Sequence, residues 1–587
     1  MNRLIAIVAL LSTAGFVSAA GPKVKIGDKV EDLQFKDIRY LNRSLRDFGD
    51  KKAYVLVFVD SGCPIVARYL PELQRLETAY RGRGVQFVAV NAGMGDTIAT
   101  MAAQAVEHGV EFPFVKDFDY RVVDAVGVER TPEVVVLDGE RMLRYRGRID
   151  DRFRTGGQIG EPTRHDLALA IDGVLAGKPV EEPMTPVEGC LITKPADNSH
   201  DKPVTFAKDV APILAKHCQK CHQPNTAAPF SLLTYDQART RGRTIAEVAS
   251  EGRMPPWFAA AHDGDRIQHH SLSDSERDTV VQWVKTGMTR GDDSQLPKQP
   301  EAVPEKWRIG EPDLVLTTIP FDLPKEGDIA YKYVALPHIF VEETWMQGVQ
   351  ILPDTPKAVH HANLAYVKIG EDFKETNFIT GVVPGGEPMT LDNGTAYRIP
   401  KGSVLALQIH FVPTGKPETV RLRVGLRYAR GTVEKQLRHM LFVDTHYAIP
   451  PGAPAYPVKV VRTLDRDVIG IGLFAHMHVR GKAMTFTATP PDGKTEPLLT
   501  IANYNFEWQI PYRWEPGKKL LPKGTKVECV GIYDNSPFNP YNPDPNKRVL
   551  DGQQTYHEMM NGFFFFIDAN EKLGLAVDPK TGHAITR

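Results

Sequence analysis

The pattern of hydrophobic and polar positions changes character along the chain. Residues 54–59 form a continuous apolar run of β-branched and aromatic side chains, as in a strand buried on both faces of a parallel sheet. Residues 68–80 then place apolar side chains at helical spacing, and residues 85–90 have the pattern of another strand. This order of strand, helix and strand predicts an α/β domain in the first part of the chain.

Two further patterns follow. Prolines at 183, 186, 195 and 203 indicate a linker, and residues 210–215 and 279–284 after it have helical spacing, which predicts a small helical unit. From residue 304 onwards, short alternating runs are separated by Pro and Gly turns every 8–15 residues or so. This last pattern predicts β-sandwiches.

Composition limits the class of protein. With 587 residues, the chain is too long for one core at roughly 100–200 residues per domain. Hydrophobic residues make up 42% and charged residues 24%, as in soluble globular proteins. The net charge of -1 offers no broad attraction to nucleic acid, so nucleic acid is not an expected partner.

The first 20 residues have the pattern of an export signal. Arg3 precedes an apolar run at 4–11, and small residues at 17–20 suit cleavage by signal peptidase. The alternative is a membrane anchor, but the run is shorter than the ~20 residues that span a bilayer. We therefore expect a periplasmic or secreted protein that does not span the membrane.

A single thiol follows the first strand. Cys63 lies at the predicted turn between strand and helix, where a helix dipole favours the thiolate, and Thr131-Pro132 precedes a later strand. Together these elements resemble the thioredoxin-like redoxin fold, with Thr131-Pro132 at its cis-proline loop. Cys63-Pro64-Ile65-Val66 lacks the second cysteine of a Cys-x-x-Cys motif, and Cys190 is a candidate resolving partner. The alternative is a redox-silent scaffold domain.

The helical unit carries a haem signature. Cys218 and Cys221 are spaced to attach the two vinyl groups of a c-type haem, and His222 follows as an iron ligand. A zinc site is the alternative, and His217 is poorly placed to complete it. The motif and the flanking helices resemble the cytochrome c family, which implies one covalently bound haem. Met254, held before two prolines, is the expected second ligand; the rivals are His269, His270 and Met288.

Histidines are grouped in the last half of the chain. His360 and His361 are adjacent, and His410 lies on a predicted strand, so that three imidazoles suit copper or zinc if the backbone bends at the adjacent pair. His476 and His478 are two residues apart, and side chains at this spacing project from one face of a strand. Each group alone is also compatible with ordinary surface or core histidines.

The combination of these groups with Thr555-Tyr556-His557-Glu558-Met559 resembles the copper type II, ascorbate-dependent monooxygenases. The resemblance implies two copper ions separated across a cleft, hydroxylation of a C–H bond with O2, and an external electron donor such as ascorbate, a quinol-linked carrier or a cytochrome. It assigns His360, His361 and His410 to the electron-donating copper. It assigns His476, His478 and Met559, rather than the neighbouring Met560, to the catalytic copper that binds O2.

One departure bears on the substrate. Peptide-amidating members of that family hold the substrate carboxylate with an Arg and a Tyr, and Phe474 and Phe563 stand at these positions. Peptidylglycine is therefore not the expected substrate, and a small, more apolar organic molecule is favoured.

The sequence as a whole predicts an exported multidomain oxidoreductase in which haem, and also thiols, supply electrons to a copper monooxygenase. Two alternatives stay open: a copper and haem electron-transfer or copper-binding protein without hydroxylase activity, and a thiol oxidoreductase centred on Cys63 as its catalytic residue. The expected units are a signal peptide at 1–20, an α/β thioredoxin-like domain at 24–190, a small all-α cytochrome c-like domain at 201–298, and two all-β jelly-roll-type sandwiches at 304–445 and 446–587.

Overall fold

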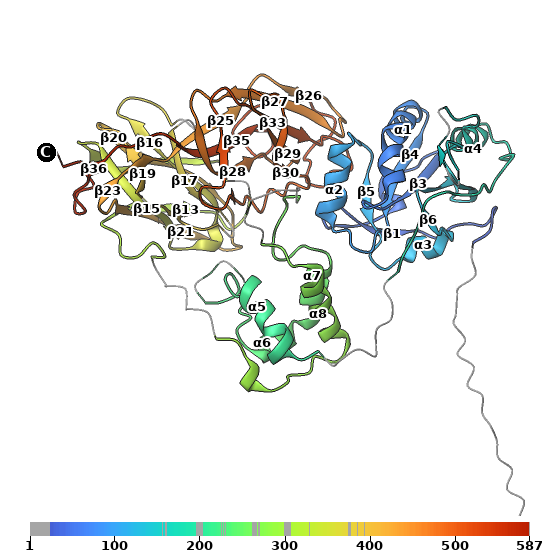
Figure 1. The fold of residues 1–587 in the computed structure, drawn as a ribbon, viewed down its shortest axis with the longest axis horizontal. Helices are drawn as coiled ribbons and strands as arrows, with labels where there is room; N and C mark the ends of the chain where they lie inside the picture. Colours follow the sequence, from blue (N-terminus) through green and yellow to red (C-terminus); the bar gives the residue numbers. More distant parts are fainter. Residues whose placement is uncertain are drawn as a thin grey trace, which may run out of the picture.

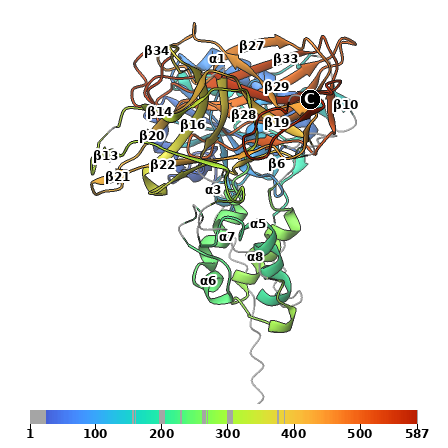
Figure 2. The ribbon, with the colours of Figure 1, turned by 90° about the vertical axis from the view of Figure 1, so that its left-hand side faces the viewer.

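The computed structural model describes residues 24–154, 157–158, 161–194, 204–224, 226, 228, 230–260, 267, 270–298, 307–327, 329–373, 377–383, 386–392 and 394–585. The predicted signal peptide and His269 lie outside the described residues. The chain forms an α/β domain, a helical unit and a large β-rich region, and the helical unit lies below the other two in Figure 1. Figure 2 shows the same helical unit projecting from the β-rich region.

The first domain is built on a mixed seven-stranded sheet of order β2-β1-β5-β4-β3-β7-β8. The predicted strands are confirmed as β3 and β4, which are buried along their whole length and pair in parallel, and the predicted helix is confirmed as α1. Helices α1, α2 and α4 pack on one face of the sheet, and α3 covers the other. The elements are β1 (Gln34–Asp37), β2 (Asn42–Ser44), β3 (Ala53–Val59), α1 (Pro64–Arg81), β4 (Val85–Asn91), α2 (Ile98–Glu107), β5 (Phe114–Lys116), α3 (Arg121–Val126), β7 (Glu133–Asp138), β8 (Leu143–Gly147) and α4 (Asp166–Leu175).

The helical unit has its own small core. Phe206 and Trp283 are buried at its centre, with ring centroids 5.7 Å apart. The predicted helix at 279–284 falls within α8, and that at 210–215 covers the end of the π-helical turn and the start of α5, so their helical character is confirmed. The elements are a π-helical turn (Phe206–Val210), α5 (Ala211–His217), α6 (Tyr235–Thr240), α7 (Gly242–Ser250) and α8 (Asp274–Lys285).

The β-rich region begins with two sheets that enclose one core. One sheet has the order β12-β22-β15-β19-β24, with β18 also paired to β15, and the other has the order β14-β20-β16-β17. Their strands are β12 (Leu314–Thr317), β14 (Lys332–Phe340), β15 (Thr344–Pro353), β16 (Val359–Lys368), β17 (Phe378–Val382), β18 (Met389–Thr390), β19 (Thr395–Ile399), β20 (Ser403–Phe411), β22 (Leu422–Tyr428) and β24 (Lys435–Gln436).

A second pair of sheets follows, of orders β25-β35-β28-β31 and β27-β33-β29-β30. Its first strand, β25, pairs with β35, so this sandwich begins before residue 446, the boundary expected from the sequence. Its last short strand, β36 (Leu575–Ala576), returns to pair with β23 (Thr432–Val433). The other strands are β25 (Arg438–Val443), β27 (Tyr456–Thr463), β28 (Val468–His476), β29 (Gly481–Thr489), β30 (Glu496–Ile501), β31 (Tyr512–Arg513), β32 (Lys519–Leu521), β33 (Lys526–Tyr533) and β35 (Asn561–Asp568).

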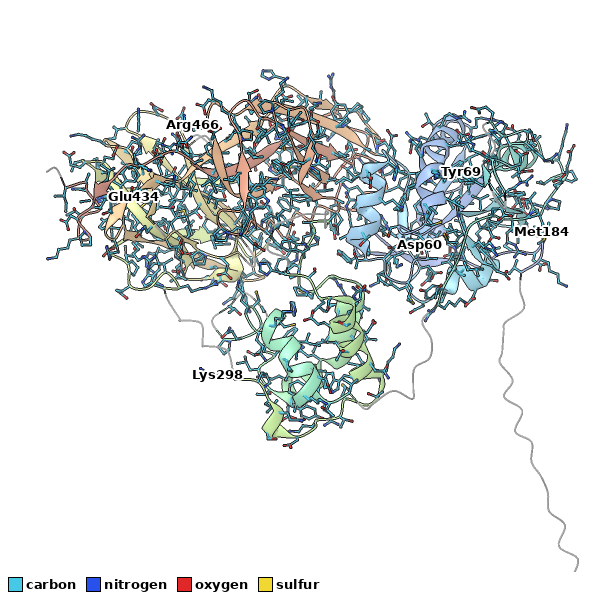
Figure 3. All side chains as sticks on the ribbon, in the orientation of Figure 1. Asp60, Tyr69, Met184, Lys298, Glu434 and Arg466 are labelled. Atoms are coloured by element: carbon cyan, nitrogen blue, oxygen red, sulfur yellow. The ribbon has the colours of Figure 1, made fainter. Side chains whose placement is uncertain are left out.

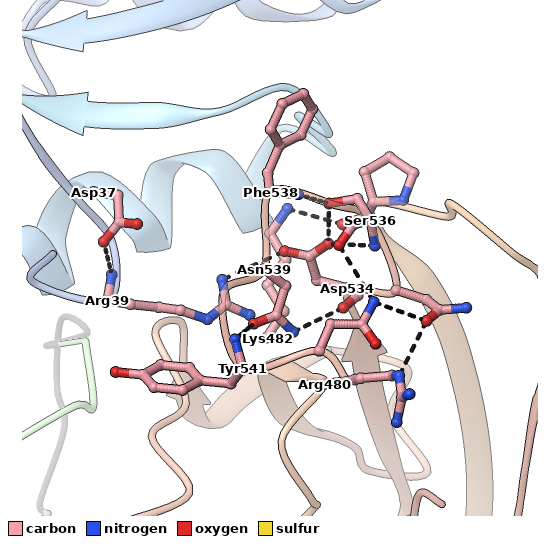
Figure 4. Close-up of polar contacts among 12 residues, drawn as sticks. Asp37, Arg39, Arg480, Lys482, Asp534, Ser536, Phe538, Asn539 and Tyr541 are labelled. Carbon is pink, nitrogen blue, oxygen red and sulfur yellow. Dashed lines mark hydrogen bonds and ion pairs between the residues drawn. The ribbon is translucent and has the colours of Figure 1, made fainter. Parts of the chain in front are cut away.

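The α/β domain contacts the second sandwich through the hairpin between β1 and β2. Arg39 of this hairpin pairs with Asp534 at 3.4 Å, next to Lys482 and Tyr541 (Figure 4). A cavity of about 350 Å³ between the two units is lined by Val85 and Pro113, at the starts of β4 and β5, among other residues. The second sandwich therefore lies at the hairpin and at the amino-terminal ends of the parallel strands.

The helical unit contacts both neighbours. Lys36 of the α/β domain forms an ion pair with Glu251, which follows α7. Lys220 pairs with Glu387 of the first sandwich at 3.1 Å, and Trp257 packs on Tyr512 of the second with ring centroids 4.9 Å apart. No helix within the described residues is both long enough and apolar enough to cross a membrane.

Candidate functional sites

Cys63 is the N-cap residue of α1, directly after β3. Its side chain is 2% exposed, and its thiol donates a hydrogen bond to the Thr131 carbonyl oxygen at 3.3 Å. Burial acts to raise the pKa of Cys63, but a hydrogen bond from Cys190 and the backbone N–H groups at the start of α1 outweigh it and lower the pKa. The Thr131-Pro132 peptide bond is cis, as the resemblance to redoxins implies.

Polar groups surround the turn that carries Cys63. Asp96 accepts hydrogen bonds from the Ser61 backbone N–H at 2.8 Å and from the Asn91 side chain at 2.6 Å. The buried Lys116 donates to Asn91 Oδ1 at 2.7 Å. These bonds hold the turn at the carboxyl end of β3 and β4, the edge of the sheet opposite to the cavity described above.

The Cys-x-x-Cys-His segment begins where α5 ends. Cys218 is the C-cap of α5 and packs against the core of the helical unit, whereas Cys221 is exposed. Burial raises the pKa of Cys218 to about 12. The His222 Nδ1 atom lies 3.1 Å from the Phe230 carbonyl oxygen, which leaves Nε2 as the atom available to a metal.

The alternative zinc site finds no support in this geometry. His217 Nε2 lies 3.0 Å from the Glu276 carboxylate of α8, so this nitrogen is engaged by a carboxylate outside the motif. Met254 follows α7, with its backbone N–H bonded to Val248 O at 3.1 Å. The rival Met288 packs in the core of the helical unit, where its sulfur lies against Gly242. Met254 as an iron ligand stays a prediction.

Three histidines meet on neighbouring strands of the first sandwich. His360 and His361 lie on β16, and His410 lies opposite His361 on β20. One ligand nitrogen from each lies within 4.8 Å of the others, and within the described residues this is the one such group of three or more His, Cys, Asp or Glu side chains. The Nδ1 atoms of His360 and His361 are 3.1 Å apart.

A β-bulge explains how adjacent histidines reach one point. Val359 pairs with Phe411 and His361 pairs with His410, so His360 is an extra residue in β16 without its own cross-strand partner. A regular strand would direct His360 and His361 to opposite faces. The bulge bends β16 so that the His360 and His361 side chains approach one another, as a shared metal site needs.

The second group lies on the second sandwich. His476 ends β28 and His478 follows it, with ring centroids 5.3 Å apart. Met559 lines a small pocket together with His476, whereas Met560 is fully buried in the sandwich core beside Gly531. The two adjacent methionines therefore have different environments, and Met559 is the one that shares a pocket with His476.

Two ring nitrogens in these groups lack partners. His410 Nδ1 and His478 Nε2 are buried and have no hydrogen-bond partner among the described residues. A buried nitrogen without a partner costs free energy unless a ligand binds it. Burial lowers the pKa of His410 to about 4 and that of His478 well below its usual value, so both rings are neutral, as metal ligation requires.

The two histidine groups adjoin one another. The ring centroids of His361 and His476 are 5.9 Å apart, although the residues belong to different sandwiches. The expectation of a cleft between two metal centres is wrong for this structure. The reason lies in tertiary packing, because the loop at 503–509 fills the space beside both groups: Phe506 stacks on His360 at 4.9 Å and also lies 6.2 Å from the His478 ring.

Residues that orient the imidazoles come from segments that sequence reasoning missed. Glu507 accepts from His360 Nε2 at 3.0 Å, and Gln509 Oε1 lies 2.7 Å from His476 Nδ1. Glu558 is fully buried and accepts the backbone N–H of His478 at 2.8 Å. Burial raises the pKa of Glu558 to about 8. Only Glu558, beside Met559, carried a signal in the sequence.

Aromatic rings enclose the pocket next to Met559. The Phe563 ring lies 5.8 Å from Phe474 and 5.1 Å from Phe378. Asn363, Gln408 and Asn561 supply the amide groups that line the same pocket. An adjoining cavity of about 130 Å³ between the sandwiches shares Asn363, Phe378 and Phe474 with it. This surface suits an apolar molecule with few polar groups.

Comparisons with known proteins concern the first domain. Residues 26–146 match the model of the AhpC/TSA family. The first domain is therefore a thioredoxin-like redoxin of the AhpC/TSA type. The predicted monooxygenase and cytochrome c domains gain no support from these comparisons and stay proposals.

Curated relatives of this domain are thiol-disulfide oxidoreductases. ResA of Halalkalibacterium halodurans is 26% identical over 131 residues, which are 22% of this chain and 73% of that protein. ResA of Geobacillus thermodenitrificans is 26% identical over 141 residues, 23% of this chain and 79% of that protein. The domain is thus similar to thiol-disulfide oxidoreductases in sequence.

Two solved structures with similar sequence are of proteins without a stated function. A hypothetical protein from Sinorhizobium meliloti is 31% identical, with a TM-score of 0.28, over 30% of this chain and 97% of that one. An uncharacterised conserved protein from Geobacillus kaustophilus is 30% identical, with a TM-score of 0.27, over 29% of this chain and 94% of that one.

Proposed function

We propose that the redoxin domain is a thiol oxidoreductase that exchanges thiols and disulfides at Cys63. The observation that carries this proposal is the position of the Cys63 thiol at the start of α1, beside the Thr131 carbonyl, with a lowered pKa. A lowered pKa increases the fraction of the nucleophilic thiolate at neutral pH. The similarity to thiol-disulfide oxidoreductases supports the same chemistry.

The test is reduction of a small model disulfide by the pre-reduced full-length protein. We expect the wild-type protein to transfer electrons to the disulfide and Cys63→Ser to lose this activity. Cys529→Ser is the control, because Cys529 is buried in the second sandwich and should not react. Equal rates for Cys63→Ser and the wild type would falsify the proposal.

We also propose that the β-rich region is a copper-dependent monooxygenase, because five buried or half-buried imidazoles lie in two adjoining groups there and the Met559 thioether lines a pocket with one of them. Three imidazoles suit either copper oxidation state, and a thioether favours Cu(I). Copper bound by His360, His361 and His410 and by His476, His478 and Met559 would supply one-electron transfer and activation of O2.

The chain's own residues would prepare this reaction. Glu507 and Gln509 fix the orientation of the His360 and His476 rings through the hydrogen bonds described above. Phe378, Phe474 and Phe563 exclude water from the pocket beside Met559 and favour a small apolar organic substrate. Asn363, Gln408 and Asn561 would orient the polar groups of that substrate.

Copper content and O2 uptake test this second function. We expect about two copper ions per chain and O2 uptake tied to hydroxylation of an apolar substrate, in line with the two ligand sets. If the protein binds copper fully but shows neither O2 uptake nor a hydroxylated product, it is instead an electron-transfer or copper-binding protein. Absence of stoichiometric copper would contradict both the monooxygenase proposal and the copper-binding alternative.

We propose one c-type haem as the electron relay in the helical unit, attached at Cys218 and Cys221 and ligated by His222 and Met254. The His222 Nδ1 contact with Phe230 supports this assignment, because it leaves Nε2 for iron. An external donor (ascorbate, a quinol-linked carrier or a cytochrome) would reduce the protein. Covalent haem attachment fits the exported location, periplasmic or secreted, that residues 1–20 indicate. A pyridine haemochrome spectrum measures the haem content.

A further inference from the structure

We propose that Cys63 and Cys190 form a reversible disulfide, with the segment 189–192 acting as a built-in partner strand of the redoxin domain. This inference rests on the proposed thiol chemistry of Cys63 and names the second thiol that the sequence Cys63-Pro64-Ile65-Val66 lacks. The pair is separated by more than a hundred residues in the chain and is brought together by a single strand pairing.

That pairing joins β11 (Cys190–Leu191) to β6 (Arg130–Thr131), an antiparallel pair in which Cys190 lies opposite Thr131. The Cys63 thiol bonds to the carbonyl oxygen of the same Thr131. Both cysteines are therefore held at one backbone position, Thr131, which precedes the cis peptide bond. Cys190 also packs against the hydrophobic cluster that contains Cys63, so the two side chains share one environment.

Gly189 permits the close approach of this segment. A Cβ atom at position 189 would lie 2.2 Å from the Thr131 carbonyl oxygen, a distance that no side chain tolerates. Arg130 donates to the Gly189 carbonyl oxygen at 2.8 Å, and the Ile192 N–H donates to the Glu129 carbonyl oxygen at 2.9 Å. The segment is thus fixed on both sides of Cys190.

The two thiols differ in the way that exchange requires. Cys63 has a lowered pKa, whereas burial and the hydrogen bond with Cys63 raise the pKa of Cys190 to about 11. Cys63 is therefore the attacking thiolate and Cys190 the resolving thiol. Cys63 is almost fully covered, whereas Cys190 is half-buried and Leu191 is 63% exposed, so a substrate meets β11 before it reaches Cys63.

No other described cysteine competes for this role. Cys529 has no exposed surface and lies within the second sandwich beside Gly562. Cys218 and Cys221 belong to the helical unit, at the end of α5. Cys63 and Cys190 are therefore the two described cysteines left to pair with one another.

The reaction is a balanced two-step exchange with an organic disulfide. The Cys63 thiolate attacks one sulfur of the disulfide, forms a mixed disulfide and releases the first thiol. Cys190 then attacks the Cys63 sulfur, the intramolecular disulfide forms and the second thiol leaves. Two electrons and two protons pass from the protein thiols to the organic disulfide. The reverse sequence, with a dithiol reductant, restores both cysteines.

The test treats the pre-reduced full-length protein with glutathione disulfide, quenches it with acid, alkylates free thiols and maps the peptides by mass spectrometry. We expect a Cys63–Cys190 cross-linked peptide that disappears on reduction. In Cys190→Ser, the mixed disulfide of Cys63 with glutathione should accumulate at least tenfold over the wild type. Gly189→Ala should slow closure of the intramolecular disulfide, whereas the matched change Gly82→Ala, which has open space around it and a helical backbone after α1, should not.

Wild-type mapping does not depend on any variant folding correctly. Cys63 and Cys190 recovered as free thiols, or linked to other cysteines, would overturn the inference. If model-disulfide reduction still requires Cys63 while no Cys63–Cys190 link forms, the proposed function stands and this inference fails. If the link forms but the protein reduces no model disulfide, the pairing stands and the proposed function fails.

Discussion

His361 of the first sandwich and His476 of the second place their imidazole rings 5.9 Å apart. The two histidine groups are therefore held together by the packing of one sandwich against the other, and neither group is isolated within its own core. We expect a metal bound by one group to change the environment of the other, because the His361 and His476 rings are neighbours.

Met559 and Met560 offer a matched test of the proposed copper site. We expect Met559→Leu to remove the copper–sulfur scattering in the X-ray absorption spectrum of the Cu(I) protein, to abolish hydroxylation and to leave the copper bound by His360, His361 and His410. The reason is that Met559 faces His476 across the pocket.

Met560→Leu is the control. Met560 is fully buried beside Gly531, so the change should lower the free energy of unfolding by less than about 1.5 kcal/mol, as for volume-conserving core exchanges. It should leave the copper–sulfur signal intact. Loss of that signal in Met560→Leu, with retention in Met559→Leu, would reverse the ligand assignment.

Lys116 should make stability depend on pH in the alkaline range. Burial lowers its pKa to about 8, against about 10.4 in an unfolded chain. Between these values the unfolded state binds more protons, so the free energy of unfolding rises with pH, by about 3 kcal/mol in total.

Lys116→Met should remove this increase, which urea denaturation at pH 7.5, 9 and 10.5 or so would measure as a difference from the wild type. The exposed Lys178→Met is the matched control. Parallel pH curves for the wild type and Lys116→Met would show that Lys116 has an ordinary pKa.

Arg39 should stabilise the contact between the redoxin domain and the second sandwich. The side chains of this Arg39–Asp534 ion pair are only 11% and 9% exposed. Arg39→Ala should therefore lower the free energy of unfolding by about 1–3 kcal/mol. The control is Arg46→Ala, because Arg46 is 72% exposed and should change stability by less than about 0.5 kcal/mol. Chemical denaturation followed by probes in each domain measures both. Equal effects would indicate that the interface does not depend on this pair.

Lys220 and Glu387 form the ion pair that joins the Cys-x-x-Cys-His segment to the first sandwich. We expect Lys220→Glu and Glu387→Lys each to slow reoxidation of the proposed haem by the Cu(II) protein, and the double reversal to restore most of the rate. Stopped-flow absorbance at the haem bands is the measurement. Glu387 also pairs with Arg308. Arg308→Ala is therefore measured alongside the double variant, to separate the loss of this second ion pair from the effect of the Lys220–Glu387 pair on the rate.

Sequence patterns located most elements because their signals are local. β3, α1 and β4 follow from runs of apolar residues, and α5 and α8 follow from helical spacing. The sandwich boundary did not follow, because β25 joins the second sandwich through a pairing with β35, more than a hundred residues further on. Such pairings have no counterpart in the local pattern.

The candidate sites divide in the same way. The histidine pairs and Met559 were visible as short motifs, but the bulge at His360 depends on the register between β16 and β20. Glu507 and Gln509 come from a loop without any pattern, and they act only because that loop packs against both histidine groups. Likewise, the contact of Cys190 with Cys63 depends on the two-residue strand β11.

The parallel strands of the redoxin domain have one further consequence. Cys63 follows the carboxyl end of β3, whereas the second sandwich meets the opposite edge, near the starts of β4 and β5. In Figure 3, Asp60 and Met184 lie on the redoxin domain, apart from Glu434 and Arg466 of the β-rich region. Cys63 therefore lies on the far side of the sheet from the second sandwich, so the proposed thiol exchange and the proposed copper chemistry would each draw on a separate reductant.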